Sequence, residues 1–468
     1  MRIKDIPKRL GFILGAQWTR DLTWTVFTIT LARHSQDILG QIVLALTYGY
    51  LVKTLVDVGL NDYLSASFAR GDSRPKELLS EVTWLKFLVF LPVMLLVFLV
   101  TQTQGYTQEL TLIVLAIAAG LGLDAICDSF FVLCQARGRQ DVEMRIRIPS
   151  ALIGIGFGIM CVLLACPPIC IALYKPIESL LCLIFALKSL AHNPLKRFGL
   201  KEFYDLTRKM RAGLIFTLMA FCAMFYNKIN VIFLKQYGTD ALVGGYGVAW
   251  ETIEGVSTLV SGALLGKVLF PLLTKLYTQD VGEFKKLAAR TAKALWGAAL
   301  PLIFLLYVES DRFLTLVYGA NFAVAVPAQQ LLTPCIATAF LHNLAAYVMI
   351  GMGQHVLLCI FYVCGLLLNI GLCFFLIPLL PLEGAALSLT LTKVAVAIGT
   401  IGYFQAKVRP LKLFDWLLLI SIALVSFGLY SFLSLYFSRE VAEIAGLCPL
   451  LGLFWAWRPP APFEHAKS

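Results

Sequence analysis

The chain has 468 residues, of which 59% are hydrophobic and 14% are charged, and its formal net charge is +11. Soluble domains carry about 25% charged residues, so this composition excludes a soluble globular protein. Apolar runs of about 20 residues, the length that crosses a hydrocarbon core of about 30 Å, recur along the whole chain. The sequence therefore predicts an all-α integral membrane protein, and we explain the net charge by membrane topology rather than by nucleic acid binding.

We expect about fourteen transmembrane helices joined by short connections. The first is polar for a span because it contains Gln17, Arg20 and Asp21, and only Cys166-Pro167-Pro168 separates the fifth from the sixth. The predicted spans lie near residues 10–32, 38–60, 81–101, 109–134, 149–166, 168–189, 212–235, 242–268, 291–308, 328–350, 355–377, 383–405, 413–435 and 440–457.

Lysine and arginine alternate strongly between successive connections. Connections of one parity hold most of them, whereas the opposite connections hold only Arg33, Lys235, Arg312 and Arg439. Because positive charge stays on the cytoplasmic side, we expect both termini and the connection near 190–211 to be cytoplasmic, and the connection near 309–327 to face outward. The first span contains charge and lacks a small-residue cleavage site, so we expect no cleavable signal peptide.

The connections are too short for a soluble domain, so any function is expected inside the helix bundle. Nearly all of the twelve cysteines lie in apolar spans without a CxxC motif, which is typical of small buried hydrophobic residues. The five histidines show no metal-ligand spacing, and we find no catalytic constellation. The sequence thus predicts no cofactor, no metal site and no enzyme. Glycines at 154, 156 and 158 predict close helix packing.

Two segments about 204 residues apart show a weak internal repeat. Residues 39–70 and 243–275 each open with Gly and apolar residues, continue through aromatic and charged residues, and end in a basic turn. Two six-span lobes related by a parallel repeat would place a substrate cavity between them. We therefore expect an N-terminal lobe at 1–205, a C-terminal lobe at 206–408, and two additional helices with a tail at 409–468.

Three stretches carry a family resemblance. They are "YGTDALVGGYGVAWE" (237–251), "LVDVGLNDYLSASFAR" (55–70) and, most specifically, "VMIGMGQHVLLCIFYVCGLLLNIGLCFFLIPLLPLEGAALSLTLTKV" (348–394). The chain resembles the polysaccharide (lipid-linked oligosaccharide) flippases of the multidrug, oligosaccharidyl-lipid and polysaccharide exporter superfamily. The resemblance implies two six-helix lobes in a V around a central cavity, with two extra C-terminal helices. Many relatives carry an acid in the seventh span, where this chain has Lys228 and Asn230.

Several charged residues fall near mid-membrane, where a Lys or Arg costs about 2.5–3.5 kcal/mol. Lys53 and Asp57 are four residues apart and share one helix face, as do Asp124 and Asp128. For Lys53 with Asp57, and for Lys175 with Glu178, structural pairing and a transport role both remain open. Asp124 and Asp128 need a proton, a cation or a basic partner, for which Arg20 and Lys53 are candidates. Lys86, Lys267 and Lys293 lie near cytoplasmic ends and are expected to snorkel.

Fixed positive charge in a cavity suits an anionic substrate, and aromatic and amide side chains suit sugars. We expect the anionic head group to bind Arg20, Lys53, Lys228 and Lys393. We expect sugar contacts from Trp24, Tyr226, Asn227, Asn230, Tyr246 and Trp250. The candidates for ion or proton coupling are Asp57, Asp124, Asp128, Glu251 and Glu254. For Lys228 a purely structural pairing with Glu251 or Glu254 remains an alternative.

The resemblance implies a flippase for polyprenyl-diphosphate-linked oligosaccharide, working by alternating access in the bacterial inner membrane. Its product would serve O-antigen (lipopolysaccharide), capsule or exopolysaccharide assembly. The expected partners are this lipid-linked substrate, membrane lipids and a polysaccharide polymerase complex. A lipid II flippase and a drug or metabolite antiporter are the alternatives. A polymerase or ligase is disfavoured, because such enzymes usually need a sizeable outer loop.

Overall fold

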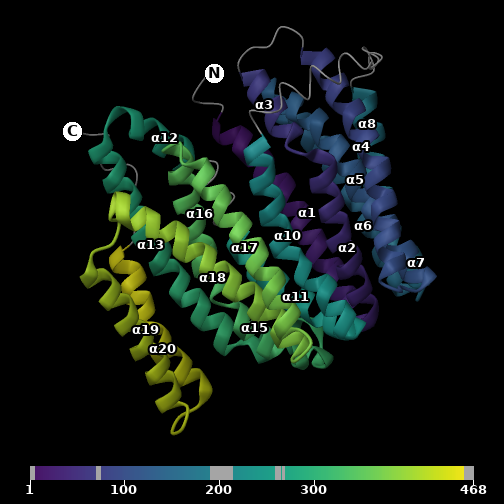
Figure 1. Cartoon of the computed structure of the whole chain (residues 1–468). Coiled ribbons are helices and arrows are strands. Elements are labelled where there is room, and N and C mark those ends of the chain that lie inside the picture. The colour runs from purple at the N-terminus through teal and green to yellow at the C-terminus, as the bar shows by residue number, and fades with distance from the viewer. Residues whose placement is uncertain (1–5, 70–74, 190–213, 259–264, 266–268, 458–468) are drawn as a thin grey trace. The chain divides into compact units, whose positions relative to one another are not determined.

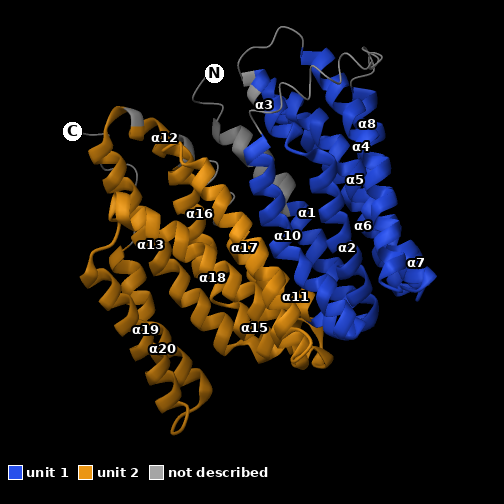
Figure 2. Cartoon of the chain, viewed as in Figure 1, with its two compact units in different colours: residues 1–245 blue, residues 246–468 orange. Residues whose placement is uncertain are grey.

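The computed structural model describes residues 6–69, 75–189, 214–258, 265 and 269–457 (Figure 1). In this part of the chain the regular elements are helices, and none is a strand. The chain divides into two compact units, unit 1 at residues 1–245 and unit 2 at residues 246–468, which Figure 2 colours separately.

Unit 1 is built from long helices joined by tight turns. Ser35 caps the second of them by accepting a hydrogen bond from the Ile38 backbone N–H, and Val58 ends it in the left-handed region at φ 42°. The helices are α1 (Ile6–His34), α2 (Gln36–Asp57), α3 (Leu60–Ala69), α4 (Pro75–Thr103), α5 (Gln108–Ala136), α6 (Gln140–Leu163), α7 (Pro168–Ala172), α8 (Tyr174–Ser189), α10 (Leu214–Tyr237) and the start of α11 (Asp240–Thr258).

Helix α5 is the centre of unit 1 and packs against α2, α3, α4 and α8. Small residues allow this close packing. A Cβ on Gly120 would lie 2.9 Å from the Lys175 backbone, and one on Gly122 would lie 2.4 Å from the Phe90 ring. In α6, Gly154 and Gly158 pack against Glu178 and Tyr174 of α8, while Gly156 meets nothing within 4 Å. The predicted packing role of this glycine run is thus confirmed for two of its three members.

The two repeat segments meet where α2 crosses the start of α11. Gly40 and Gly244 occupy equivalent positions 204 residues apart, and a Cβ on Gly244 would lie 3.2 Å from the Gly40 backbone nitrogen. A Cβ on Gly40 would lie 1.8 Å from the Asp240 carbonyl oxygen. Gln36 donates a hydrogen bond to the Ala241 carbonyl at 3.1 Å. Only glycine at position 40 allows the two backbones to approach this closely.

Unit 2 contains the remaining helices. Its packing runs from α12 through α13 to α16, and from α16 through α18 to α17. The helices after α11 are α12 (Phe270–Gln279), α13 (Val281–Val308), α14 (Ser310–Tyr318), the 3₁₀ turn η4 (Ala320–Ala325), α15 (Val326–Leu332), α16 (Cys335–Gly351), α17 (His355–Leu376), α18 (Pro381–Val408), α19 (Leu413–Leu433) and α20 (Arg439–Trp457).

The two C-terminal helices, α19 and α20, pack together and dock on α13. At one end of this contact the Trp296 and Trp416 rings meet edge-on with centroids 5.7 Å apart, and Lys293 pairs with Asp415 at 2.7 Å. In the middle, Phe304 and Leu450 are buried together. The large apolar side chains that remain exposed on α19 suit contact with lipid.

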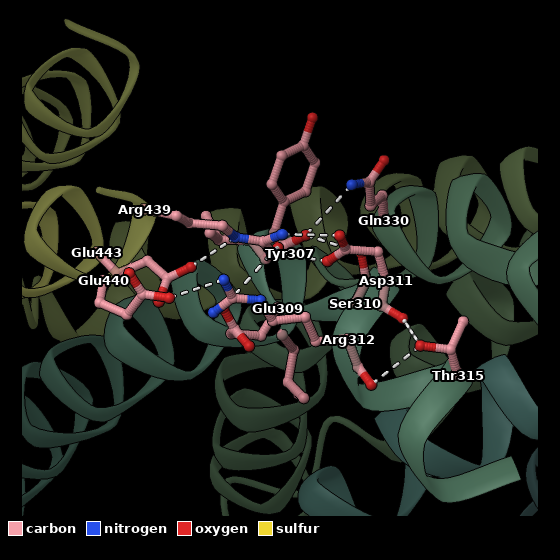
Figure 3. Close-up of polar contacts among 12 residues, drawn as sticks. Tyr307, Glu309, Ser310, Asp311, Arg312, Thr315, Gln330, Arg439, Glu440 and Glu443 are labelled. Atoms are coloured by element: carbon pink, nitrogen blue, oxygen red, sulfur yellow. Dashed lines mark hydrogen bonds and ion pairs between the residues drawn. The ribbon is translucent and has the colours of Figure 1, made fainter. Parts of the chain in front are cut away.

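Arg439 ties the other end of α20 to the segment that follows α13 (Figure 3). Its guanidinium donates to both carboxylate oxygens of Asp311, at 2.6 and 2.7 Å, and to Glu443 at 2.7 Å. Arg312 adds a second link by donating to Glu440 at 2.9 Å. A bidentate arginine pair fixes orientation as well as distance, so this cluster sets how α20 meets α14.

Twelve helices of the described part are long and apolar enough to cross a membrane, which confirms the all-α membrane class. The first and eighth predicted spans correspond to α1 and α11, which fall outside this group of twelve; α1 carries Arg20 and Asp21, and α11 carries Glu251 and Glu254. The count of fourteen stays a prediction. So does the division at residues 205 and 408. Lys267 and the 190–211 connection lie outside the described residues.

We predict that the link between Asp311 and Arg439 weakens in acid. The hydrogen bonds from Arg439 lower the pKa of Asp311 from its usual 3.8 to about 2. A carboxylate with a lowered pKa stabilises the fold above its unfolded pKa and loses this effect as the pH falls through its folded pKa. The Asp311→Asn variant should therefore melt at a lower temperature than the native chain at pH 6, and the gap should close between about pH 4 and pH 2. A gap that is the same at every pH would contradict this role of the ion pair.

Candidate functional site

The predicted mid-membrane charges of unit 1 gather around α5. Asp128 receives two cations from two other helices, Lys53 of α2 at 2.8 Å and Arg147 of α6 at 2.7 Å. Arg147 also pairs with Glu143, one turn away on α6, at 2.9 Å. Asp128 thus has the basic partner that the sequence required, and Lys53 was a correct candidate. Arg147 was missed because we assigned it to a cytoplasmic connection, whereas α6 begins at Gln140 and carries it to α5.

Asp124, one turn earlier on α5, pairs with Lys175 of α8 at 2.7 Å. Lys175 also donates to Glu178 at 2.9 Å, so the predicted Lys175–Glu178 contact is present. The Lys175 residue is 8% exposed. A lysine this buried keeps its charge at tolerable cost only because two carboxylates surround it.

Lys86 does not snorkel, contrary to expectation. Its side chain is fully buried and donates to Asp57 at 2.6 Å, to Asn61 at 2.9 Å and to the Ala125 carbonyl at 2.7 Å. All three ammonium hydrogens therefore have acceptors inside the protein. Lys53 and Asp57 do not pair with each other: although the two residues share a face of α2, each pairs with a different helix. Lys53 bonds to Asp128 of α5, and Asp57 bonds to Lys86 of α4.

We name this set of side chains the α5 charge network. It contains Lys53, Asp57, Lys86, Asp124, Asp128, Glu143, Arg147, Lys175 and Glu178. Each of its ions has an opposite charge within 3 Å, so every ion of the network is paired. The Lys53 side chain is 30% exposed and Arg147 is 24% exposed, whereas Lys86 is 0% exposed. Lys53 and Arg147 are therefore the two network cations most accessible to a ligand.

Lys228 of α10 lies close to Tyr50, which is one turn from Lys53 on α2. Its ammonium nitrogen is 5.1 Å from the centroid of the Tyr50 ring, within the range of a cation–π contact. Tyr50 is 37% exposed and lies one turn before Lys53 on α2. We name Tyr50, Lys53 and Lys228 the α2–α10 cationic face. Tyr50 was missed from the sequence, although its i, i+3 spacing to Lys53 was available as a signal.

The other predicted residues of unit 1 lie in several places. Arg20 is about half exposed, with its Nε 3.9 Å from Asp21. Trp24 packs against Phe27 of its own helix and Tyr174 of α8, with centroids 5.5 and 6.1 Å away. On α10, Tyr226 and Asn230 are buried, at 5% and 0% exposure, and Asn227 donates to the Ala223 carbonyl.

In unit 2, Lys393 of α18 lies 4.5 Å from the centroid of the Trp250 ring of α11. Trp250 is 6% exposed and Tyr246 is fully buried. Glu251 and Glu254 lie on the same helix and are partly buried. Among all described residues, no group of three or more His, Cys, Asp and Glu side chains could hold a metal ion.

A neutral polar cluster in unit 2 was missed because the histidines were examined only for metal spacing. His342 of α16 lies 3.0 Å from the Thr400 hydroxyl of α18 and 3.0 Å from the Tyr362 hydroxyl of α17. Nearby along the same helices, Asn369 donates to Thr392 at 3.1 Å and to the Ser388 carbonyl at 3.3 Å. These hydrogen bonds join three helices through neutral groups.

A model of the polysaccharide biosynthesis protein family matches residues 31–327. The chain belongs to this family. No curated protein sequence matches it significantly. Among solved structures, the chain is similar to the lipid II flippase MurJ in an inward closed conformation, with a TM-score of 0.73 at 13% identity over 95% of this chain and 97% of that one.

Two MATE transporters are also similar. An inward-facing MATE family transporter of the MOP superfamily gives a TM-score of 0.64 at 14% identity, over 83% of this chain and 94% of that one. The eukaryotic MATE transporter AtDTX14 gives 0.60 at 15% identity, over 86% and 95%. The fold is therefore that of the MOP-superfamily transporters, and the predicted resemblance to polysaccharide flippases is confirmed.

We predict that Lys86 is needed for folding rather than for substrate contact. Replacing it by methionine leaves the Asp57 carboxylate without its cation, which should cost about 3 kcal/mol. The Lys86→Met variant should yield little monodisperse protein, and what remains should melt at a lower temperature in detergent. The double variant Lys86→Met/Asp57→Asn should recover most of the loss, because no unpaired charge remains. Lys76→Met, at an exposed position on the same helix, serves as the control. A double variant no better than the single one would contradict the pairing argument.

Proposed function

We propose that this chain flips polyprenyl-diphosphate-linked oligosaccharide from the cytoplasmic to the outer leaflet, by alternating access, for surface polysaccharide assembly. The observation that carries the proposal is the α2–α10 cationic face. Lys53, which is 30% exposed and bonds to Asp128, lies one turn from Tyr50, and Lys228 lies against the Tyr50 ring. A diphosphate has the charge to engage both lysines, and the Tyr50 hydroxyl adds a hydrogen-bond donor.

The family supports a glycan substrate over a drug, because its description is polysaccharide biosynthesis protein. The lipid II flippase MurJ aligns with 95% of this chain, against 83% and 86% for the two MATE transporters. This greater coverage makes a lipid II flippase the second candidate, since lipid II also joins sugars to a polyprenyl diphosphate. Both candidate functions require Lys53 and Lys228 to bind a diphosphate.

The shared carboxylate of Asp128 suggests how transport is coupled. When Lys53 turns toward a phosphate, Asp128 loses one of its two cations and becomes a better proton acceptor. When the substrate leaves, Lys53 returns and displaces the proton. In this scheme Asp128 exchanges a proton for Lys53, while Asp124 and Asp57 stay paired. Arg20, Lys393, Glu251 and Glu254 remain further candidates for the head-group and coupling roles, and the aromatic and amide residues of α1, α10 and α11 for sugar contact.

The proposal includes the bacterial inner membrane with both termini in the cytoplasm. Reporter fusions check this directly: a periplasm-active reporter placed after Tyr318 should be active, and one placed after Lys201 should be inactive. A cytoplasm-active reporter at the same two positions should give the reverse. Equal signals at both positions would overturn the topology, and with it the assignment of an outward end to either unit.

We predict that charge at positions 53 and 228 is needed for translocation. In proteoliposomes with a fluorescent polyprenyl-diphosphate oligosaccharide, Lys228→Gln and Lys53→Gln should reduce translocation at least about tenfold, as expected for losing one charge-assisted contact to phosphate. Lys228→Arg should keep partial activity, because it keeps the charge. Lys188→Gln, at an exposed position at the end of α8, is the matched control. Asp128→Asn should bind substrate but lose the response to a pH gradient.

Three outcomes would each contradict a part of this proposal. Full activity of Lys53→Gln and Lys228→Gln would exclude the α2–α10 cationic face as the head-group site. Translocation of lipid II but not of other lipid-linked oligosaccharides in the same vesicles would favour the second candidate. An Asp128→Asn variant that still follows the pH gradient would remove Asp128 from the coupling scheme.

A further inference from the structure

A pocket of about 770 Å³ opens in unit 1 where α2, α5 and α11 begin and where α4 and α10 end. The predicted topology places this end of the helices outside the cell. The pocket is separate from the α2–α10 cationic face, since the two share no residue. It is lined by Gln41, Thr103, Gln104, Gly105, Tyr106, Thr107, Glu109, Leu110, Lys235, Gln236, Tyr237 and Asp240.

The pocket wall is held in place by the crossing of the two repeat segments. Gly40 allows the Asp240 backbone to approach α2, and Asp240 then pairs with Lys235 at 2.5 Å and accepts a hydrogen bond from Gln41 at 3.2 Å. Tyr106, another lining residue, hydrogen-bonds to the buried Tyr48 at 3.3 Å. The pocket is therefore formed by groups of five helices and of the turn between α4 and α5.

The polar groups of the pocket are mostly neutral. Three glutamine amides line it, Gln41 from α2, Gln236 from α10 and Gln104 from the turn after α4, and Gln236 donates to Gln104. The Oε1 atom of Gln41 is buried, and no group in the described part of the chain donates to it. Burial raises the pKa of Tyr106, so that its hydroxyl stays protonated. The pocket thus offers both donors and acceptors without a net cation.

The charges and aromatic rings of the pocket indicate which chemical class of ligand it can bind. Lys235 is already paired with Asp240, and Glu109 adds a negative charge, so phosphates and acidic sugars are disfavoured. Tyr106 and the half-exposed Tyr237 present ring surface for an apolar face of a ligand. The volume falls in the range of about 300–1,000 Å³ that is typical of small-molecule sites.

We infer that this pocket binds a neutral, hydroxyl-rich sugar unit on the outward side of the protein. A sugar hydroxyl both donates and accepts hydrogen bonds, so paired amides match it on both counts. The inference deepens the proposed function, on which it rests for the origin of the sugar: the glycan part of a flipped substrate would be held here while its diphosphate is released elsewhere. Because the pocket recognises uncharged groups, it would select the glycan and not the lipid carrier.

The test is binding of neutral sugars to the purified full chain in lipid nanodiscs, followed by saturation-transfer NMR titration. The probes are the methyl glycosides of glucose, galactose, mannose, rhamnose and N-acetylglucosamine, with glucose 1-phosphate as the anionic comparison. We expect at least one neutral probe to bind more tightly than glucose 1-phosphate. The double variant Gln104→Ala/Gln236→Ala should raise its dissociation constant roughly tenfold, as expected for losing two hydrogen bonds.

Gln102→Ala is the matched control, because Gln102 is an exposed glutamine of α4 near the pocket that does not line it. It should leave the dissociation constant unchanged. No binding of any neutral probe, tighter binding of glucose 1-phosphate, or equal binding by the double variant and the native chain would each overturn the inference. The titration measures no transport, so a negative translocation assay alongside sugar binding would reject the proposed function and leave the pocket standing.

Discussion

A charge in hydrocarbon must be compensated by a neighbour, and this constraint organises unit 1 around α5. Four cations come from four different helices: Lys53 from α2, Lys86 from α4, Arg147 from α6 and Lys175 from α8. Each reaches an oxygen of α5, either a carboxylate or the Ala125 carbonyl. Sliding α5 by one residue along any neighbour would separate these pairs. The charges therefore specify the register of the bundle, a role for which buried polar groups are well suited.

Small residues make these contacts possible. Gly120 lies against Lys175 and Pro176, and Gly49 of α2 lies against Leu121 of α5. In a membrane the apolar side chains gain little by leaving lipid, so helix association depends on close packing and polar contacts. A larger side chain at position 120 would push α8 away and lengthen the Lys175–Asp124 pair. The ion pairs of α5 thus depend on the close helix packing that its glycines allow.

More of the fold than of the candidate site could be predicted from the sequence. Hydrophobic length determines a span almost by itself because the bilayer fixes the thickness, and the break at Cys166-Pro167-Pro168 was correctly located between α6 and α7. Ion partners are different, since i, i+4 spacing gives a shared face but does not say which helix that face meets. Lys53 and Asp57 share a face and bond to different helices, and Lys86 bonds to residues 29 and 39 positions away. Such pairs depend on helix neighbours that one sequence does not reveal.

The helices around α5 in unit 1 and helices α16, α17 and α18 in unit 2 satisfy their polar groups in different ways. Unit 1 joins its helices by ion pairs, whereas α16, α17 and α18 are joined by His342, Asn369 and the hydroxyl groups around them. A carboxylate shared by two cations can exchange either of them for a proton or for a ligand. Within the proposed function, Asp128 and its two cations in unit 1 are therefore the place where substrate charge is sensed. The neutral network of unit 2 would hold its helices together while that exchange takes place.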